Sequence, residues 1–170
     1  MMLASHRRRV ATYRNRLQLV RVGARAIVSR AHPILVHVVP TRRCNLACAY
    51  CNEYDDSSAP VPTEQMLARL DHLARLGTSM VSFSGGEPLL HPDLDALIRR
   101  VRSRGMVAEL LTNGYLLGRD RIDRLNEAGL NRLQISVDNV TPDEVSKKSL
   151  EGLDRKLELL ARHAAFDCNV

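Results

Sequence analysis

The chain has 170 residues, of which 45% are hydrophobic, so it is long enough to bury one core and to form a globular protein. It contains no run of roughly 18 apolar residues that could span a membrane, and no apolar signal-peptide core follows the early arginines, which predicts a cytoplasmic protein. The net charge of +6 is uneven: eight of the 25 basic residues lie in residues 1–30, which contain no acid. A nearly neutral body with few aromatic residues argues against a nucleic-acid partner.

Residues 1–31 form the first predicted unit, a basic arm of helical character. Its apolar residues recur at approximately helical spacing, at Val10, Leu17, Val20, Ala24, Ile27 and Val28. Such a helix could pack on the rest of the protein, on a partner or on an acidic membrane surface, and packing on the protein is the simplest interpretation. An RNA or membrane adaptor built on this arm would instead associate in a salt-sensitive way.

Residues 32–170 form the second predicted unit, in which short apolar runs alternate with amphipathic helices that stop at glycine. Strands are expected at residues 34–39, 80–84, 107–112 and 133–137, and a fifth opens near residue 166. Helices are expected at residues 63–76, 92–104 and 122–128, followed by a polar helical stretch over residues 141–163. Strands separated by helices of this length imply right-handed crossovers and a parallel sheet, so the predicted fold class is α/β.

Each predicted strand ends in a small polar cluster. Thr41 follows the first strand, and the clusters at residues 84–87, 112–114 and 136–138 follow the next three. In parallel β/α folds the carboxyl ends of the strands form the active face. The sequence therefore predicts one rim at which these polar residues converge.

Three of the four cysteines, Cys44, Cys48 and Cys51, lie within eight residues directly after the first strand. So tight a cluster favours a metal or redox cofactor over a disulfide framework, in a reducing compartment. Three thiolates can hold three irons of a cubane cluster and leave the fourth iron open to a substrate. Structural zinc is the alternative, but it needs a fourth ligand, and Cys168 and the histidines do not stand at a recognisable zinc spacing.

The cysteine spacing C-x3-C-x2-C, with Tyr50 before the last cysteine, and the string Gly85-Gly86-Glu87-Pro88 resemble the radical S-adenosylmethionine (SAM) superfamily. This resemblance implies a parallel partial (β/α) barrel with a [4Fe–4S] cluster on the three cysteines and SAM as the second cofactor. It also implies reductive cleavage of SAM into methionine and a 5′-deoxyadenosyl radical, which abstracts hydrogen from a substrate that the sequence does not identify. A reductant such as flavodoxin or ferredoxin would supply the electron.

The resemblance also implies roles for individual residues. Gly85, Gly86 and Glu87 would contact the methionine amino group of SAM, and Tyr50 would lie near the adenine. Ser136 and Asp138, at the end of the fourth strand, would hold the ribose hydroxyls or the methionine carboxylate. Each has a simpler alternative: a turn for the glycines, packing over the cluster for Tyr50, and local capping for the last two.

The predicted core contains four β/α units and the opening of a fifth, whereas the family has six. We therefore expect a chain that is truncated after the fourth unit and a barrel that is incomplete at the C-terminus. The alternative function is a non-catalytic iron–sulfur or electron-transfer module, which would bind a cluster without cleaving SAM.

Overall fold

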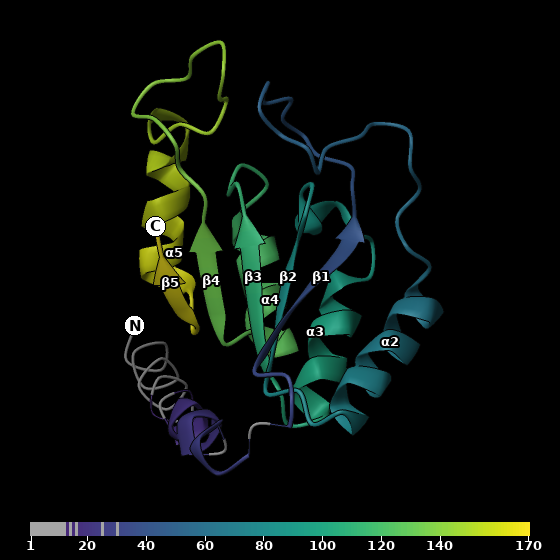
Figure 1. Cartoon of the computed structure of the whole chain (residues 1–170). Coiled ribbons are helices and arrows are strands. Elements are labelled where there is room, and N and C mark those ends of the chain that lie inside the picture. The colour runs from purple at the N-terminus through teal and green to yellow at the C-terminus, as the bar shows by residue number, and fades with distance from the viewer. Residues whose placement is uncertain (1–12, 14, 16, 25, 30) are drawn as a thin grey trace.

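The computed structural model describes residues 13, 15, 17–24, 26–29 and 31–170 (Figure 1). Five parallel strands form one sheet in the order of the chain: β1 (Leu35–Thr41), β2 (Met80–Gly85), β3 (Val107–Thr112), β4 (Arg132–Ile135) and β5 (Asp167–Asn169). The crossovers contain the helices α2 (Thr63–Arg75), α3 (Leu94–Ser103), α4 (Arg119–Ala128) and α5 (Asp154–His163), with short 3₁₀ turns η1 (Pro88–Leu90) and η2 (Glu151–Leu153). The predicted α/β class and the parallel, partial barrel are confirmed.

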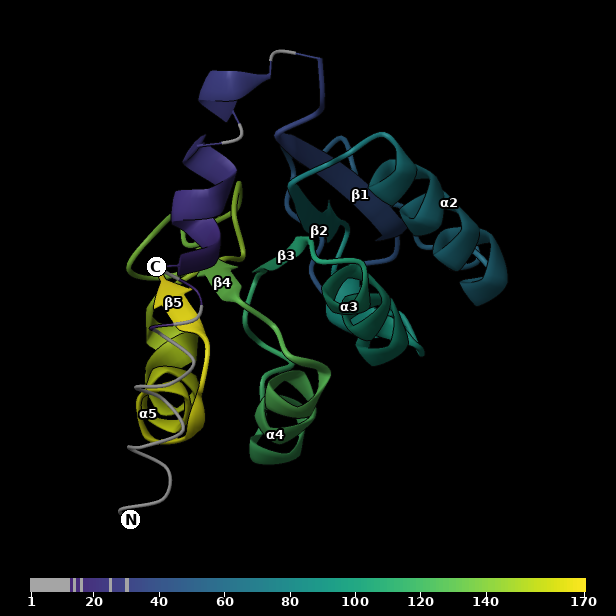
Figure 2. The ribbon, with the colours of Figure 1, turned by 90° about the horizontal axis from the view of Figure 1, so that it is seen from below.

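The sheet is curved, and the four crossover helices cover one of its faces (Figure 2). Alternate strand residues such as Val81, Phe83 and Leu110 point to that face and are fully buried in the core with the apolar stripes of the helices. Burial of a side chain as large as Phe83 contributes about 1.5–3 kcal/mol. The intervening residues, Ser82 and Glu109 among them, point to the opposite face, which is more polar.

Helices α2 and α3 end shortly before the two glycines at which the sequence predicted their ends. Gly77 and Gly105 follow the last turns of α2 and α3 with φ angles of 78°, a left-handed conformation that glycine adopts without a steric penalty. These turns return the chain to the amino end of the sheet. All polar strand ends therefore meet at the opposite rim.

The polar helical stretch predicted over residues 141–163 is wrong in its first half. Residues 136–150 contain no helix, and α5 begins at Asp154. The carboxylate of Asp143 accepts the N–H groups of Val145 (2.9 Å) and Ser146 (2.6 Å), which closes a turn in place of a helix. The N–H of Lys147 is directed to another part of the chain, the Sγ of Cys48.

The N-terminal arm is helical over the described residues up to 28 and lies across the amino ends of the strands (Figure 2). Its polar side chains make the contacts: Asn15 donates to the carbonyl of Asn131 (3.0 Å), and Gln18 donates to that of Gly105 (2.9 Å). The apolar residues expected to pack inward are exposed, Val20 by 69% and Ile27 by 84%, while Val10 lies outside the described residues. Of the described helices, none is long and apolar enough to cross a membrane.

Candidate functional site

The three motif cysteines lie in the loop after β1, at the carboxyl rim of the sheet. They line one pocket together with Leu46 of the same loop. The other lining residues come from the ends of the next three strands and from the loop after β4: Ser84, Gly85, Gly86, Leu111, Thr112, Asn113, Ser136 and Lys148. Residues up to 104 positions apart in the sequence thus meet at the predicted rim.

The three thiols differ in their surroundings. Cys48 is buried, whereas Cys44 and Cys51 are half-buried, and none of them forms a disulfide. Burial raises the pKa of the Cys44 thiol, although the N–H of Leu46, 3.4 Å from its Sγ, opposes the shift; the nearby charges of Glu87 and Cys51 raise it further. In the described part of the chain, no three His, Cys, Asp or Glu side chains lie close enough together to hold one metal ion.

Gly85 and Gly86 allow the loop after β2 to lie against the loop that leads to the cysteines. A Cβ on Gly86 would lie 2.2 Å from the carbonyl oxygen of Arg43, and one on Gly85 would lie 2.6 Å from that of Thr41. Backbone hydrogen bonds join the same two loops, from Gly86 N to Thr41 O (3.1 Å) and from Glu87 N to Arg43 O (2.7 Å). The glycines are therefore required for this close approach as well as for any contact with a ligand.

Glu87 is fully buried, and its carboxylate does not line the pocket. One oxygen accepts from the Thr112 hydroxyl (2.8 Å) and the Leu89 N–H (3.0 Å), and the other accepts from the Asn113 N–H (2.9 Å). Burial raises the pKa of Glu87, and these three donors partly oppose the shift. The carboxylate thus joins the ends of β2 and β3 below the pocket.

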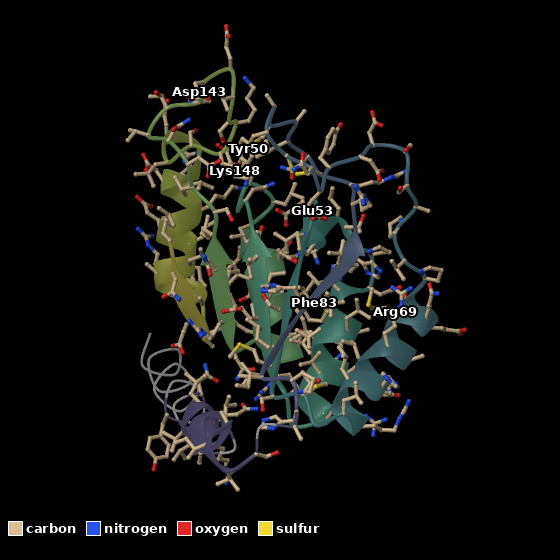
Figure 3. The ribbon with its side chains drawn as sticks, in the orientation of Figure 1. Tyr50, Glu53, Arg69, Phe83, Asp143 and Lys148 are labelled. Carbon is tan, nitrogen blue, oxygen red and sulfur yellow. The ribbon has the colours of Figure 1, made fainter. Side chains whose placement is uncertain are left out.

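A second polar cluster lies beside the pocket, where Tyr50 approaches the loop after β4 (Figure 3). The Tyr50 hydroxyl donates to Asp138, and the ammonium of Lys148 donates to the same hydroxyl (2.8 Å). The Ser146 hydroxyl donates to Asp138 (2.6 Å), and this bond, followed by the Tyr50 bond, lowers the pKa of Asp138. Burial alone would lower the pKa of Lys148, but its hydrogen bond to Tyr50 and the surrounding negative charges raise it.

Sequence reasoning did not select Asn113, Ser146 and Lys148, which also belong to this site. The Asn113 amide lies 3.7 Å from the Sγ of Cys44. The string Asn113-Gly114 was indistinguishable from an ordinary turn, and Ser146 and Lys148 fell within the stretch predicted as helix. Only the fold shows that they approach the cysteines.

The donor set of the pocket fits an iron–sulfur cluster. Three thiol sulfurs, which are soft ligands, face one space, and a cubane takes each thiolate on a different iron, so it does not require the close grouping of a mononuclear site. The backbone of Gly85 and Gly86 and the side chains of Ser136 and Lys148 provide hydrogen-bonding groups for a second, polar ligand next to the thiols.

Comparisons with known proteins agree with this fit. A model of the radical SAM superfamily matches residues 38–165. The chain is 37% identical over 116 residues to the PqqA peptide cyclase of Gluconobacter oxydans, which covers 66% of this chain and 32% of that enzyme. It is 35% identical over 118 residues to the Fe-coproporphyrin III synthase of Methanosarcina barkeri, covering 66% of this chain and 29% of that enzyme. The matched segment thus spans about a third of the length of these relatives.

Solved structures show the same fold. SuiB of Streptococcus suis bound to the precursor peptide SuiA aligns with a TM-score of 0.64 and 19% identity, over 85% of this chain and 33% of that one. BtrN in complex with SAM and 2-DOIA aligns with a TM-score of 0.59 and 19% identity, over 80% and 56% of the two chains. Because the family match covers most of the chain, including β2 to β4, the four crossover helices and the cysteine loop, the chain belongs to the radical SAM superfamily, whose members use a [4Fe–4S] cluster and SAM.

Proposed function

We propose that this protein is a radical SAM enzyme that holds a [4Fe–4S] cluster on Cys44, Cys48 and Cys51. The observation that carries the proposal is the pocket that these three thiols share with Gly85 and Gly86. When bound, the cluster and SAM supply a one-electron cleavage that yields methionine and a 5′-deoxyadenosyl radical able to abstract hydrogen from a substrate. One relative is named for the peptide that it cyclises and another for the porphyrin that it synthesises, so the proposal concerns the cleavage step that the family shares.

The residues around the thiols have defined tasks in this proposal. Gly85 and Gly86 present backbone atoms to the methionine end of SAM, and Glu87 fixes the position of that backbone from below. Ser136 offers a hydroxyl to the ribose hydroxyls or the methionine carboxylate, and Asp138, whose pKa is lowered, offers a carboxylate that accepts hydrogen bonds from the ribose hydroxyls. Tyr50, which is bonded to Asp138 and Lys148 beside the pocket, lies near the adenine of the bound SAM.

The same residues bear on the cellular compartment and the electron donor of the enzyme. Three clustered thiols, one buried and two half-buried, that form no disulfide suit a reducing compartment, so we expect the protein to act in the cytoplasm. The electron for the cluster would come from a small reductant such as flavodoxin or ferredoxin. We further propose that residues 32–170 carry this site and that residues 1–31 form an accessory arm.

The proposal is tested by anaerobic reconstitution with iron and sulfide, followed by dithionite and SAM and an assay for 5′-deoxyadenosine. Cys48→Ala should lose the product, because it removes one thiolate ligand of the cluster. Cys168→Ala, which removes an exposed thiol in β5, is the matched control and should retain both iron and product.

Two outcomes would contradict the proposal. A cluster that forms without nucleoside product would favour the alternative of a non-catalytic iron–sulfur module. Iron uptake that is equal in the parent protein and in Cys48→Ala would show that Cys48 is not a ligand, which contradicts the three-thiol site.

A further inference from the structure

The segment 143–149, in the loop after β4, lies against the cysteine loop and contacts it at backbone level. The N–H of Ala49 donates to the carbonyl of Val145 (2.9 Å), and the N–H of Lys147 donates to the Sγ of Cys48 (3.3 Å). The two loops are separated by nearly 100 residues in the sequence. Of the three motif cysteines, the buried one is therefore held by a distant part of the chain.

Ser146 makes the second contact with the same sulfur. Its Oγ lies 3.9 Å from the Sγ of Cys48, and its side chain is almost fully buried. The turn closed by Asp143 fixes the backbone of Ser146, and the N–H of Lys148 donates to its Oγ (3.1 Å). The hydroxyl is thus held next to the sulfur by bonds that do not involve the cysteine.

The single hydrogen of the Ser146 hydroxyl has two acceptors within reach. In this structure the Ser146 hydroxyl donates this hydrogen to Asp138 (2.6 Å). In the contact between Ser146 and Cys48, the donor is therefore the thiol of Cys48. A thiolate that binds iron has no hydrogen to donate. The hydroxyl then becomes the donor to sulfur, while Asp138 keeps its hydrogen bond from Tyr50.

We propose that Ser146 and the N–H of Lys147 are positioning groups that hold Cys48 and raise the reduction potential of the cluster through hydrogen bonds to its thiolate. This inference rests on the proposed function. Hydrogen bonds to cluster sulfur stabilise the more negative, reduced state, and groups around the ligands tune metal sites in general. Loss of a donor therefore shifts the potential to a more negative value.

The test compares Ser146→Ala with Ser149→Ala. Ser149 is a matched control because it is equally buried in the same loop, but its hydroxyl is paired with the Tyr115 hydroxyl (3.1 Å) and not with sulfur. The midpoint potential of each reconstituted protein is measured by redox titration with electron paramagnetic resonance. We expect a more negative potential in Ser146→Ala, an unchanged potential in Ser149→Ala, and a return toward the parent value in Ser146→Thr, which retains a hydroxyl.

A second measurement does not depend on the cluster. In the protein without iron, the rate of alkylation of Cys48 by iodoacetamide, followed by peptide mass spectrometry, should rise several-fold in Ser146→Ala and stay unchanged in Ser149→Ala. Equal potentials and equal alkylation rates in Ser146→Ala and Ser149→Ala would overturn this inference. The proposed cleavage of SAM would still stand. A failure of all variants to take up iron would count against the proposed function, and the alkylation rates would still test the contact with Cys48.

Discussion

Glu87→Ala is the substitution whose cost follows most directly from the structure. It leaves the Thr112 hydroxyl and the N–H groups of Leu89 and Asn113 without acceptors in a buried site. A buried donor without a partner costs about 1–3 kcal/mol, and water that enters the vacated space offsets part of this, so the free energy of unfolding should fall by roughly 3–5 kcal/mol. Glu87→Gln keeps one carbonyl oxygen but turns an amide toward the Asn113 N–H, which should cost about 1–2 kcal/mol.

Urea unfolding followed by circular dichroism measures these differences. Glu53→Gln is the control, because Glu53 is an exposed carboxylate in the cysteine loop (Figure 3), and it should change the stability by less than about 0.5 kcal/mol. The reasoning would be refuted if Glu87→Ala were as stable as the control. It would also be refuted if Glu87→Gln were the more damaging of the two changes.

The pH dependence of stability tests the same residue independently. Because burial raises the pKa of Glu87, the folded protein holds this proton more tightly than the unfolded chain. Its contribution to stability is therefore present below the ordinary pKa of a glutamate and is lost as the pH rises through the raised value. Aspartates such as Asp138, whose pKa is lowered, contribute to stability in the opposite direction. Subtracting the free energy of unfolding of Glu87→Gln from that of the parent protein at each pH removes these contributions. The remaining difference in free energy should fall as the pH rises.

Three further changes should have separable effects. Gly86→Ala should lower both the urea midpoint and the iron bound after reconstitution. In Gly118→Ala the new Cβ would meet no atom within 4 Å, and although the loss of glycine at the N-cap of α4 costs some stability, the bound iron should be unchanged. Equal iron content in the two variants would contradict the close-approach argument. Tyr50→Phe keeps the ring but removes the hydroxyl that bridges Asp138 and Lys148. The Kd for SAM, measured by calorimetry on the reconstituted protein, should therefore rise by about fivefold. An unchanged Kd would exclude a role of this hydroxyl in SAM binding. The alternative in which the arm contacts an acidic membrane surface predicts co-sedimentation of the parent protein with anionic vesicles, less strongly as salt rises. A Val20→Ser/Ile27→Ser double substitution, which removes two exposed apolar side chains, should then weaken this binding by about tenfold without altering the unfolding free energy. Equal binding to neutral vesicles would contradict this alternative.

The regular part of the fold could be predicted from the sequence because local signals and tertiary packing agree there. The run at residues 107–112 coincides with β3, and Gly77 and Gly105 end the helices that precede β2 and β3. The signals disagree in the N-terminal arm. Its apolar spacing indicated the buried face of a helix, yet the amino ends of the strands offer carbonyl groups such as that of Asn131, which pair with Asn15.

The sequence predicted the candidate site only where a single short motif contains all the residues of that part of the site. The cysteine loop and the glycines after β2 meet this condition. The contact between Ser146 and Cys48 does not, because it joins two irregular loops whose approach depends on the curvature of the sheet and on the turn at Asp143. Periodicity carries no information about such segments, since they are irregular and the contacts that join them, such as that from Ala49 N to Val145 O, are made with distant partners.

The role of Glu87 shows why a motif and a contact are different kinds of evidence. The family pattern associates this residue with the amino group of SAM, and a carboxylate would suit an ammonium ion. In the structure the carboxylate is committed to three donors, one of which is the N–H of Asn113, and the amide of that same residue lies beside the Sγ of Cys44. Removal of Glu87 should therefore displace Asn113 and disturb the cysteine loop before any ligand is present. Its effect on iron uptake in the absence of SAM then distinguishes a positioning residue from one that binds the cofactor directly.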